Sequence, residues 1–230
     1  MQSQPQPVVV VQSRIQSVMQ QVYLWMTAGL LVTGAISSMI FNSPTLLEML
    51  VKPFVFIALF VVELVLVIAI SAFINKMSPT LATGLFILYA AVNGITLTPI
   101  FIAYTSASIA TAFFTTAGMF AALTLYGSVT KRNLSGMGRF MLMGLFGLCI
   151  ATLVNIFLKN TMLDFVISIF GVIIFAGLTA YDTQRLNQLA SQANSEDEIG
   201  RFSIMGALIL YLDFINLFLY LVRLFGRRRD

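Results

Sequence analysis

Long apolar runs, separated by short polar breaks, make up most of the chain. Seven runs are close to the roughly 20 residues that a helix needs to cross a hydrocarbon core of about 30 Å: residues 23–41, 53–74, 81–103, 107–129, 140–158, 165–181 and 202–222. Polar and apolar positions do not alternate within the runs, which argues against the strands of a membrane barrel. Backbone polar groups in lipid must bond internally, so each run is predicted to be a helix. The predicted fold class is all-α, a polytopic membrane protein with seven spanning helices.

The breaks between the runs divide the chain. Short breaks at residues 42–44, 76–79 and 104–106 carry turn-forming and charged residues, and residues 182–201 form the one long polar connection. The first 22 residues are polar and glutamine-rich, without a charged segment followed by a short apolar core, so we expect a solvated tail and no cleaved signal peptide. The predicted division is a polar tail over residues 1–22, a membrane domain over 23–224 and a basic tail over 225–230.

Composition excludes most other classes of protein. Hydrophobic residues make up 59% of the chain and charged residues 10%, whereas a soluble domain is nearer half apolar and a quarter charged. The low charge also argues against intrinsic disorder. A single cysteine, Cys149, excludes a disulfide scaffold, and the absence of histidine excludes imidazole metal sites and nucleophiles activated by histidine. No cofactor is expected.

The positions of basic residues predict the orientation in the membrane. Cytoplasmic loops are rich in Lys and Arg, and one side of the predicted bundle carries seven of them: Arg14, Lys76, Lys131, Arg132, Arg139, Arg185 and Arg201. The other loops carry only Lys52 and Lys159, so the N-terminus is predicted to be cytoplasmic. Seven spans put the basic stretch at residues 223–229 outside; a re-entrant last helix would keep it inside. The formal charge of +4 is expected to meet lipid headgroups and not nucleic acid.

Three acids interrupt or end the apolar runs. Glu63 lies well inside the second run, Asp182 ends the sixth, and Asp213 lies near the middle of the seventh. An acid at the bilayer centre costs about 2.5–3.5 kcal/mol on insertion scales, so such residues usually face a bundle interior or water and mark a pathway. A structural hydrogen bond between helices is the alternative for each of them.

Helical periodicity places polar and small residues beside two of these acids. On the last helix Asn216 and Tyr220 share the face of Asp213. On the sixth helix the face of Asp182 is predicted to include Ser168, Gly171, Phe175 and Leu178. Both faces are therefore predicted to meet protein or a water-filled cavity and not lipid.

Oxygen atoms are the available ligands. The third helix carries Asn93, Thr96, Thr98 and Pro99, and Pro99 should kink it and free a backbone carbonyl. Carboxylates, carbonyls and water suit hard cations such as Ca²⁺. Two carboxyls in contact cannot both ionise cheaply, so they also tend to share a proton. The predicted partners are therefore calcium ions and protons, which should compete.

Two segments of the chain resemble each other. Residues 120–128 read FAALTLYGS and residues 175–183 read FAGLTAYDT, with five of nine positions identical at an offset of 55. The likeness fits a repeat of helix pairs, as in some transporters, or chance similarity between apolar helices. In this comparison Gly127 stands at the place of Asp182.

Two aspartate motifs carry a resemblance to a known family. Residues 178–184 read LTAYDTQ and residues 210–218 read LYLDFINLF; both are similar to the last two helices of the Bax inhibitor-1 family. Residues 93–100, NGITLTPI, resemble that family's third-helix motif. The likeness runs from about Tyr23 to Arg229, and the bacterial inner-membrane branch is the closest match.

This resemblance implies a fold and a function. The implied fold is a seven-helix bundle whose last helix is enclosed by the other six. The implied function is a pH-sensitive calcium leak channel, with Asp182 and Asp213 as the proton sensor and as transient calcium ligands. We expect Glu63, Asn93, Thr96, Thr98 and Asn216 to line the pore or support the pair. In some members an arginine on the second helix locks the aspartate pair; here the second helix has no arginine and offers Glu63 instead.

Other functions fit parts of the pattern. Two membrane aspartates are also found in intramembrane proteases, but the second motif here lacks the glycines of those enzymes, so we expect no enzyme. The internal likeness would suit a proton-coupled transporter. A regulator that binds membrane proteases or cell-death proteins, without transport, is the remaining alternative. The expected location is the bacterial inner membrane.

Overall fold

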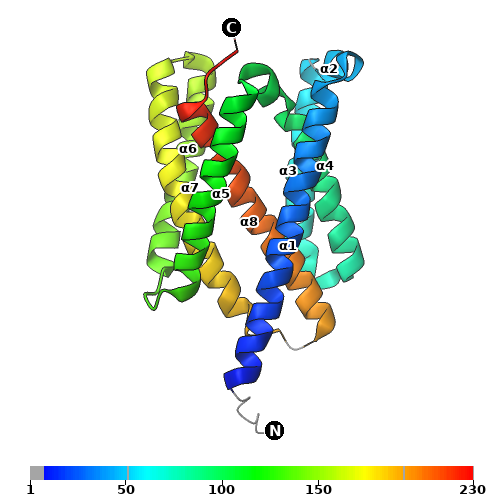
Figure 1. Ribbon diagram of the computed structural model, residues 1–230, viewed down its shortest axis with the longest axis vertical. Helices are drawn as coiled ribbons and strands as arrows, with labels where there is room; N and C mark the ends of the chain where they lie inside the picture. The colour runs from blue at the N-terminus through cyan, green and yellow to red at the C-terminus, as the bar shows by residue number, and fades with distance from the viewer. Residues whose placement is uncertain (1–7, 51, 194, 230) are drawn as a thin grey trace. The chain divides into compact units, whose positions relative to one another are not determined.

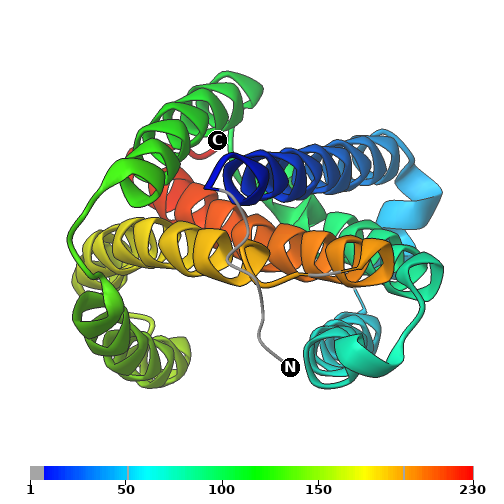
Figure 2. The same ribbon diagram turned by 90° about the horizontal axis from the view of Figure 1, so that it is seen from below.

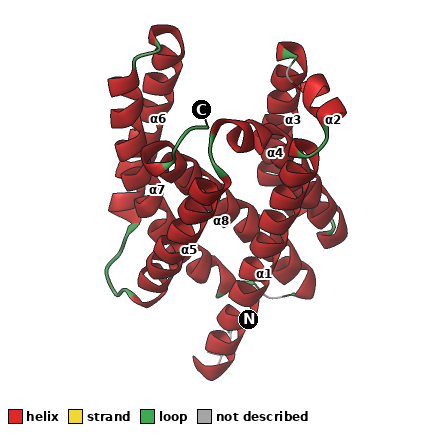
Figure 3. Cartoon of the chain, turned by 45° about the horizontal axis from the view of Figure 1, so that its top comes forward, coloured by secondary structure: helices red, strands yellow, loops and turns green. Residues whose placement is uncertain are grey.

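The computed structural model describes residues 8–50, 52–193 and 195–229. Its elements are α1 (Val8–Phe41), α2 (Pro44–Leu50), α3 (Pro53–Phe73), a 3₁₀ turn (Ile74–Lys76), α4 (Pro79–Ala103), α5 (Ser106–Val129), α6 (Ser135–Leu158), α7 (Thr161–Ala190) and α8 (Glu196–Phe225) (Figure 1). The described residues form helices and loops without a strand (Figure 3). The all-α prediction is therefore confirmed.

Seven of the helices are long and apolar enough to cross a membrane, as the run pattern predicts. The short helix α2 is additional. The first spanning helix begins at Val8, within the glutamine-rich stretch, and not at Tyr23. Val18, Met19 and Val22 are buried in this stretch, so tertiary packing extends the helix beyond the apolar run.

The long polar connection predicted over residues 182–201 is mostly helical. Helix α7 continues to Ala190, and α8 already begins at Glu196. Leu186 and Ala190 are buried, so α7 keeps an apolar face after its polar residues begin. The start of α8 has acids in its first turn, where the helix dipole favours negative charge. The Ser195 hydroxyl also accepts a hydrogen bond from the backbone N–H of Glu198 at 3.2 Å.

The chain folds as two compact units. The first contains the described residues of Met1–Pro99 together with Leu186–Ile209, and the second contains Ile100–Arg185 together with the described residues of Leu210–Asp230. In the first unit, hydroxyls of α1 donate to carbonyls of α4. Thr33 donates to Ala90 at 2.8 Å, and Ser37 donates to Gly94. A Cβ at Gly94 would lie 2.7 Å from the Thr33 carbonyl oxygen, so this close helix contact requires glycine.

The second unit is built on α5, α6, α7 and the C-terminal half of α8. Its core consists of buried apolar residues of α6, α7 and α8: Leu148, Ile167, Ile174, Phe175, Leu178, Leu217 and Leu221. Helices α6 and α7 run side by side in both views (Figures 1 and 2). On α5, Phe113 and Phe120 pack edge-on against Phe214 of α8, each with ring centroids 5.5 Å apart.

Helix α8 is the most buried of the seven spanning helices. Protein covers 67% of its most apolar stretch, compared with 44% for α4 and 6% for α6. Most of its residues from Ser203 to Val222 are buried, among them Leu210, Asp213, Leu217 and Phe218, whereas Leu212, Asn216 and Leu219 on one face are partly exposed. A spanning helix that carries a carboxyl needs such cover, because lipid offers that group no partner. Enclosure of this helix by the other six stays a prediction.

Contacts at the ends of the helices fix which ends lie together. In the first unit, Gly200 at the start of α8 meets Pro79 at the start of α4. In the second unit, Tyr104 after α4 pairs with Arg228 after α8 in an isolated bridge. Helix α8 is unbroken from Glu196 to Phe225. Its length and apolar composition suit a complete crossing of the membrane, which stays the prediction for the last helix.

Candidate functional site

The contact between α7 and α8 brings the two aspartate helices together. A Cβ at Gly171 of α7 would lie 2.5 Å from the Tyr220 ring of α8, so this glycine lets the helices approach closely. The Phe175 and Tyr220 rings stack at 5.9 Å. Ser168 and Leu178, on the same face of α7, are buried. The face of α7 that carries Asp182 thus meets protein, as its sequence predicts.

Asp213 is a buried carboxyl within a membrane-spanning helix. Its residue is only 5% exposed, and its Oδ2 atom has no hydrogen-bond partner among the described residues. The Asp182 carboxyl is the neighbouring charge that acts on it. A buried oxygen without a partner has the capacity to bind a proton or a cation.

Asp182 lies on α7, is half-buried, and has a cation nearby. The charge that acts on it is Arg185, one turn further along the same helix. Asp182 does not end its helix, as the apolar run suggested, because α7 continues to Ala190. The cation that acts on Asp182 is therefore on α7, and not on the second spanning helix as in some members of the family that the sequence resembles.

Helix α5 fixes the segment of α7 around Asp182. A Cβ at Gly127 would overlap the Ala180 carbonyl and lie 3.1 Å from the Thr183 Cβ. In the internal sequence likeness Gly127 stands at the place of Asp182. The contact explains why a glycine is found there, because a side chain at this position would push α5 and α7 apart.

The loop between α5 and α6 holds the same segment from a second side. The Gln184 side chain donates to the Arg132 carbonyl and accepts from the Leu134 N–H, both at 2.9 Å. A Cβ at Gly138 of α6 would overlap the Tyr181 ring. Sequence reasoning missed Gly138 and the role of Gln184, because neither residue shows by itself which loop it faces.

The other candidate residues gather in the first unit or bond within their own helices. Glu63 Oε1 accepts hydrogen bonds from Asn93 Nδ2 at 3.2 Å and from the Thr96 hydroxyl at 2.5 Å. The Thr98 hydroxyl donates to the Gly94 carbonyl, and Asn216 donates to the Leu212 carbonyl. Glu63, Asn93 and Thr96 thus form one polar cluster on α3 and α4.

A resident metal site is not formed by the described side chains. No group of three or more carboxylate or thiol side chains that could hold a metal is found among residues 8–50, 52–193 and 195–229. Calcium takes 6–8 oxygen ligands, so two aspartates alone would leave most of the ligand positions to water and carbonyls.

Comparison with known proteins identifies the family. The family model described as "Inhibitor of apoptosis-promoting Bax1" matches residues 15–230. The chain belongs to the Bax inhibitor-1 family. The Escherichia coli inner membrane protein YbhL is 50% identical over 218 residues, which cover 94% of this chain and 93% of YbhL. An uncharacterized protein of Deinococcus radiodurans is 41% identical over 217 residues, covering 94% and 93%. One from Borreliella burgdorferi is 43% identical over 209 residues, covering 88% and 90%.

Membership of the Bax inhibitor-1 family agrees with the resemblance seen in the two aspartate motifs. Together with the seven spanning helices, it makes this protein an integral membrane protein of the Bax inhibitor type. Asp182 and Asp213 both lie in the matched region, as do Glu63, Asn93, Thr96, Thr98 and Asn216.

Proposed function

We propose that the protein is a pH-sensitive calcium leak channel gated by protons on Asp182 and Asp213. The observation that carries the proposal is the buried Asp213 carboxyl, which has Asp182 as its charged neighbour and an oxygen without a hydrogen-bond partner. The relative in Escherichia coli is named an inner membrane protein, and we place this protein in the same membrane with its N-terminus in the cytoplasm. We assign it no catalytic activity.

The gating step is a change in the force between α7 and α8. At low pH the two carboxyls share a proton, which removes their repulsion and holds α7 against α8. As the pH rises both carboxyls ionise, and like charges in a poorly solvated place repel each other. Separation of the helices then exposes carboxylate oxygens that Ca²⁺ can use in passing, and flux increases with pH.

Glu63, Asn93 and Thr96 form a hydrogen-bonded polar cluster in the first unit. The Glu63 carboxylate, the Asn93 amide and the Thr96 hydroxyl carry oxygen atoms of the kind that hard cations prefer as ligands. Asn93 and Thr96 both donate to Glu63, so they hold the carboxylate in place. We assign to this cluster a role in lining the ion path, separate from the proton sensor.

Calcium flux into liposomes tests the proposal. The purified chain is reconstituted with a calcium dye inside, and flux is measured between pH 5 and 8. Wild-type flux should rise with pH, whereas Asp213→Asn, Asp182→Asn and the double variant should show a flat profile, because the pair can no longer carry two charges. Asp164→Asn is the control, because this acid lies in the first turn of α7 and should leave the pH profile unchanged.

Two results would overturn the proposal. If both single variants keep the wild-type pH profile, the aspartates are structural hydrogen-bonding groups. If wild-type liposomes show no calcium flux at any pH, the protein acts without transport, and a regulatory role takes the place of the channel.

A further inference from the structure

A cavity with a mainly apolar lining and several hydroxyl groups lies beside the N-terminal half of α5, away from the aspartate pair. Its volume is about 710 Å³. The hydroxyl residues Thr105, Ser108, Thr111 and Thr115 line one wall, and Arg227 contributes from the segment that follows α8. All of these residues belong to the second unit.

The C-terminal segment is bonded to the turn between α4 and α5, and this builds the second wall. The Thr105 N–H donates to the Arg227 carbonyl at 3.1 Å, and the Arg229 N–H donates to the Ala103 carbonyl at 2.9 Å. The Arg227 N–H donates to the Ser108 hydroxyl at 2.9 Å. The backbone of Arg227 is thus fixed from both sides, and its guanidinium extends from a defined point at the cavity.

Thr105, Ser108 and Arg227 line the end of the cavity that we call its mouth. The groups at this mouth favour an anion. Arg227 makes no side-chain ion pair within the described residues, and Arg228 and Arg229 follow it. The Ser108 hydroxyl accepts bonds from Thr105 and from the Arg227 N–H, and the Thr105 hydroxyl accepts one from the Ser108 N–H. The Thr105 hydroxyl proton is used in this pair, so the Ser108 hydroxyl proton is left as a donor. A guanidinium with a hydroxyl donor is a suitable combination for phosphate oxygens.

The depth of the cavity separates a lipid from a free ion. The turn at Thr105 joins two spanning helices, so the mouth lies at the membrane surface. Thr115 lies nine residues after Ser106, a descent of about 14 Å or half of the hydrocarbon core. Phe225 and Leu221 line the cavity with apolar surface. A free phosphate would fill the mouth alone, whereas a phospholipid has a phosphate for the mouth and a chain for the remainder.

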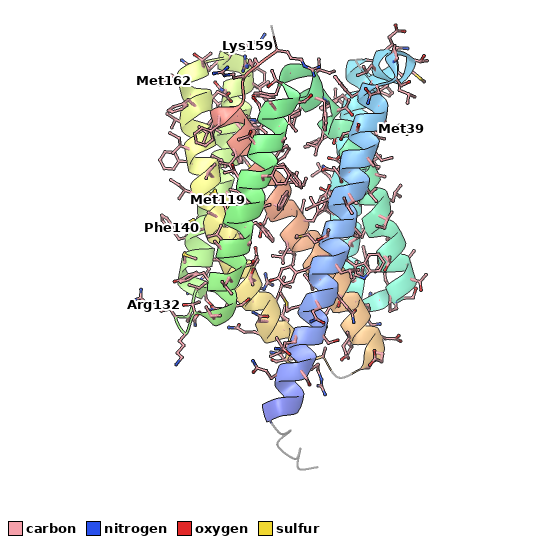
Figure 4. The ribbon with its side chains drawn as sticks, in the orientation of Figure 1. Met39, Met119, Arg132, Phe140, Lys159 and Met162 are labelled. Carbon is pink, nitrogen blue, oxygen red and sulfur yellow. The ribbon has the colours of Figure 1, made fainter. Side chains whose placement is uncertain are left out.

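We propose that this cavity binds an anionic phospholipid. The phosphate lies against Arg227 and Ser108, and one acyl chain follows α5 past Thr111 and Thr115. The three consecutive arginines favour a lipid with net negative charge over a zwitterionic one. The site is at the end of the second unit where α5 begins, and because α5 and α6 run in succession, Lys159 after α6 returns to this end. Figure 4 shows Lys159 and Arg132 at opposite ends of this unit.

Native mass spectrometry of the purified chain tests the site. Retention of phosphatidylglycerol and of phosphatidylethanolamine is compared for the wild type, Arg227→Gln, Thr111→Trp and Lys159→Gln. Thr111→Trp fills the lower cavity without a change of charge, and Lys159→Gln removes a cation at the same end of the unit outside the cavity. We expect preferential retention of phosphatidylglycerol by the wild type and by Lys159→Gln. Retention of phosphatidylglycerol by Arg227→Gln and by Thr111→Trp should fall roughly tenfold. The first variant loses a charge-assisted hydrogen bond, and the second loses the contact with the acyl chain.

Three outcomes would overturn the lipid site. Equal retention by Arg227→Gln and Lys159→Gln would mean that the cavity does not select the phosphate. A loss in Arg227→Gln with full retention in Thr111→Trp, together with displacement of the lipid by millimolar inorganic phosphate, would indicate a phosphate site at the mouth alone. Equal retention of both lipids by the wild type would remove the charge argument. Thermal unfolding of each variant is measured in parallel. An unchanged melting temperature shows that a loss of lipid does not reflect a loss of the folded structure.

Discussion

The side chains around the aspartate pair combine two carboxyls with one cation. Asp213 is buried in α8, Asp182 is half-buried in α7, and Arg185 acts on Asp182 from one turn away. Arg185 is exposed, so water screens its effect and its interaction is worth no more than a typical surface ion pair. It still favours the ionised form of Asp182, and in the proposed channel it therefore favours the open state.

Replacement of this cation should shift the pH dependence of flux. Without Arg185 the pair keeps its shared proton to higher pH, so the pH of half-maximal calcium flux for Arg185→Gln should rise by a few tenths of a unit. The shift is measured in liposomes at low salt and should shrink at high salt, where exposed charges are screened. Lys131→Gln is the control, because it removes an equal charge from the loop between α5 and α6. An equal midpoint for both variants would show that Arg185 does not act on the gate.

At the scale of elements, glycines decide how closely the helices of the second unit pack. Gly127 of α5 lies against the Ala180 backbone, Gly138 of α6 lies against Tyr181, and Gly171 of α7 lies against Tyr220. Each of these contacts involves α7, so α5, α6 and α8 together fix the position of the helix that carries Asp182. Small residues are what allow helix backbones to come close in lipid, where no hydrophobic force drives helices together.

A side chain at Gly127 should disrupt this packing. Gly127→Leu inserts a side chain where the Ala180 carbonyl already lies, and overpacking of this kind costs about 1–3 kcal/mol. Gly118→Leu is a matched control on the same helix, because no atom lies within 4 Å of a Cβ at that position; its better helix propensity should leave it neutral or slightly stabilised. Thermal unfolding in detergent compares the two. Equal melting temperatures would argue that α5 and α7 are not in close contact.

The sequence predicted the apolar elements better than their ends. Every spanning helix followed from an apolar run, because lipid allows few other structures. The helical residues 182–190 and 196–201 could not be read in this way, because outside the lipid a polar helix is maintained by capping and by packing of residues such as Leu186. Likewise, Asp213 could be identified from its charge in an apolar run. The anchoring of Gln184 to the Arg132 loop could not, because it depends on a contact between residues 52 positions apart.

At the scale of the whole chain, the order of spans constrains the topology. Seven spans place the two termini on opposite sides, and each loop alternates accordingly. The basic segment after α8 pairs with the turn between α4 and α5. It therefore lies on the side away from the loop of Lys131 and Arg132, although positive charge normally stays in the cytoplasm. In the proposed orientation this is the outer side, and pairing with that turn, together with the anionic lipid proposed for the neighbouring cavity, would give these arginines partners there.

Cysteine labelling tests this topology directly. In a background with Cys149→Ser, which removes the native exposed thiol, single cysteines are placed by Asp230→Cys, Lys159→Cys and Arg132→Cys. With a cytoplasmic N-terminus, an impermeant maleimide added to intact cells should label the first two, whereas Arg132→Cys should be labelled only after lysis. Lys159 and Arg132 lie at opposite ends of the second unit (Figure 4), so they must respond oppositely whichever way the protein is inserted. Labelling of Arg132→Cys alone in intact cells would reverse the orientation. Labelling of Lys159→Cys without Asp230→Cys would mean that α8 does not bring the C-terminal segment across the membrane.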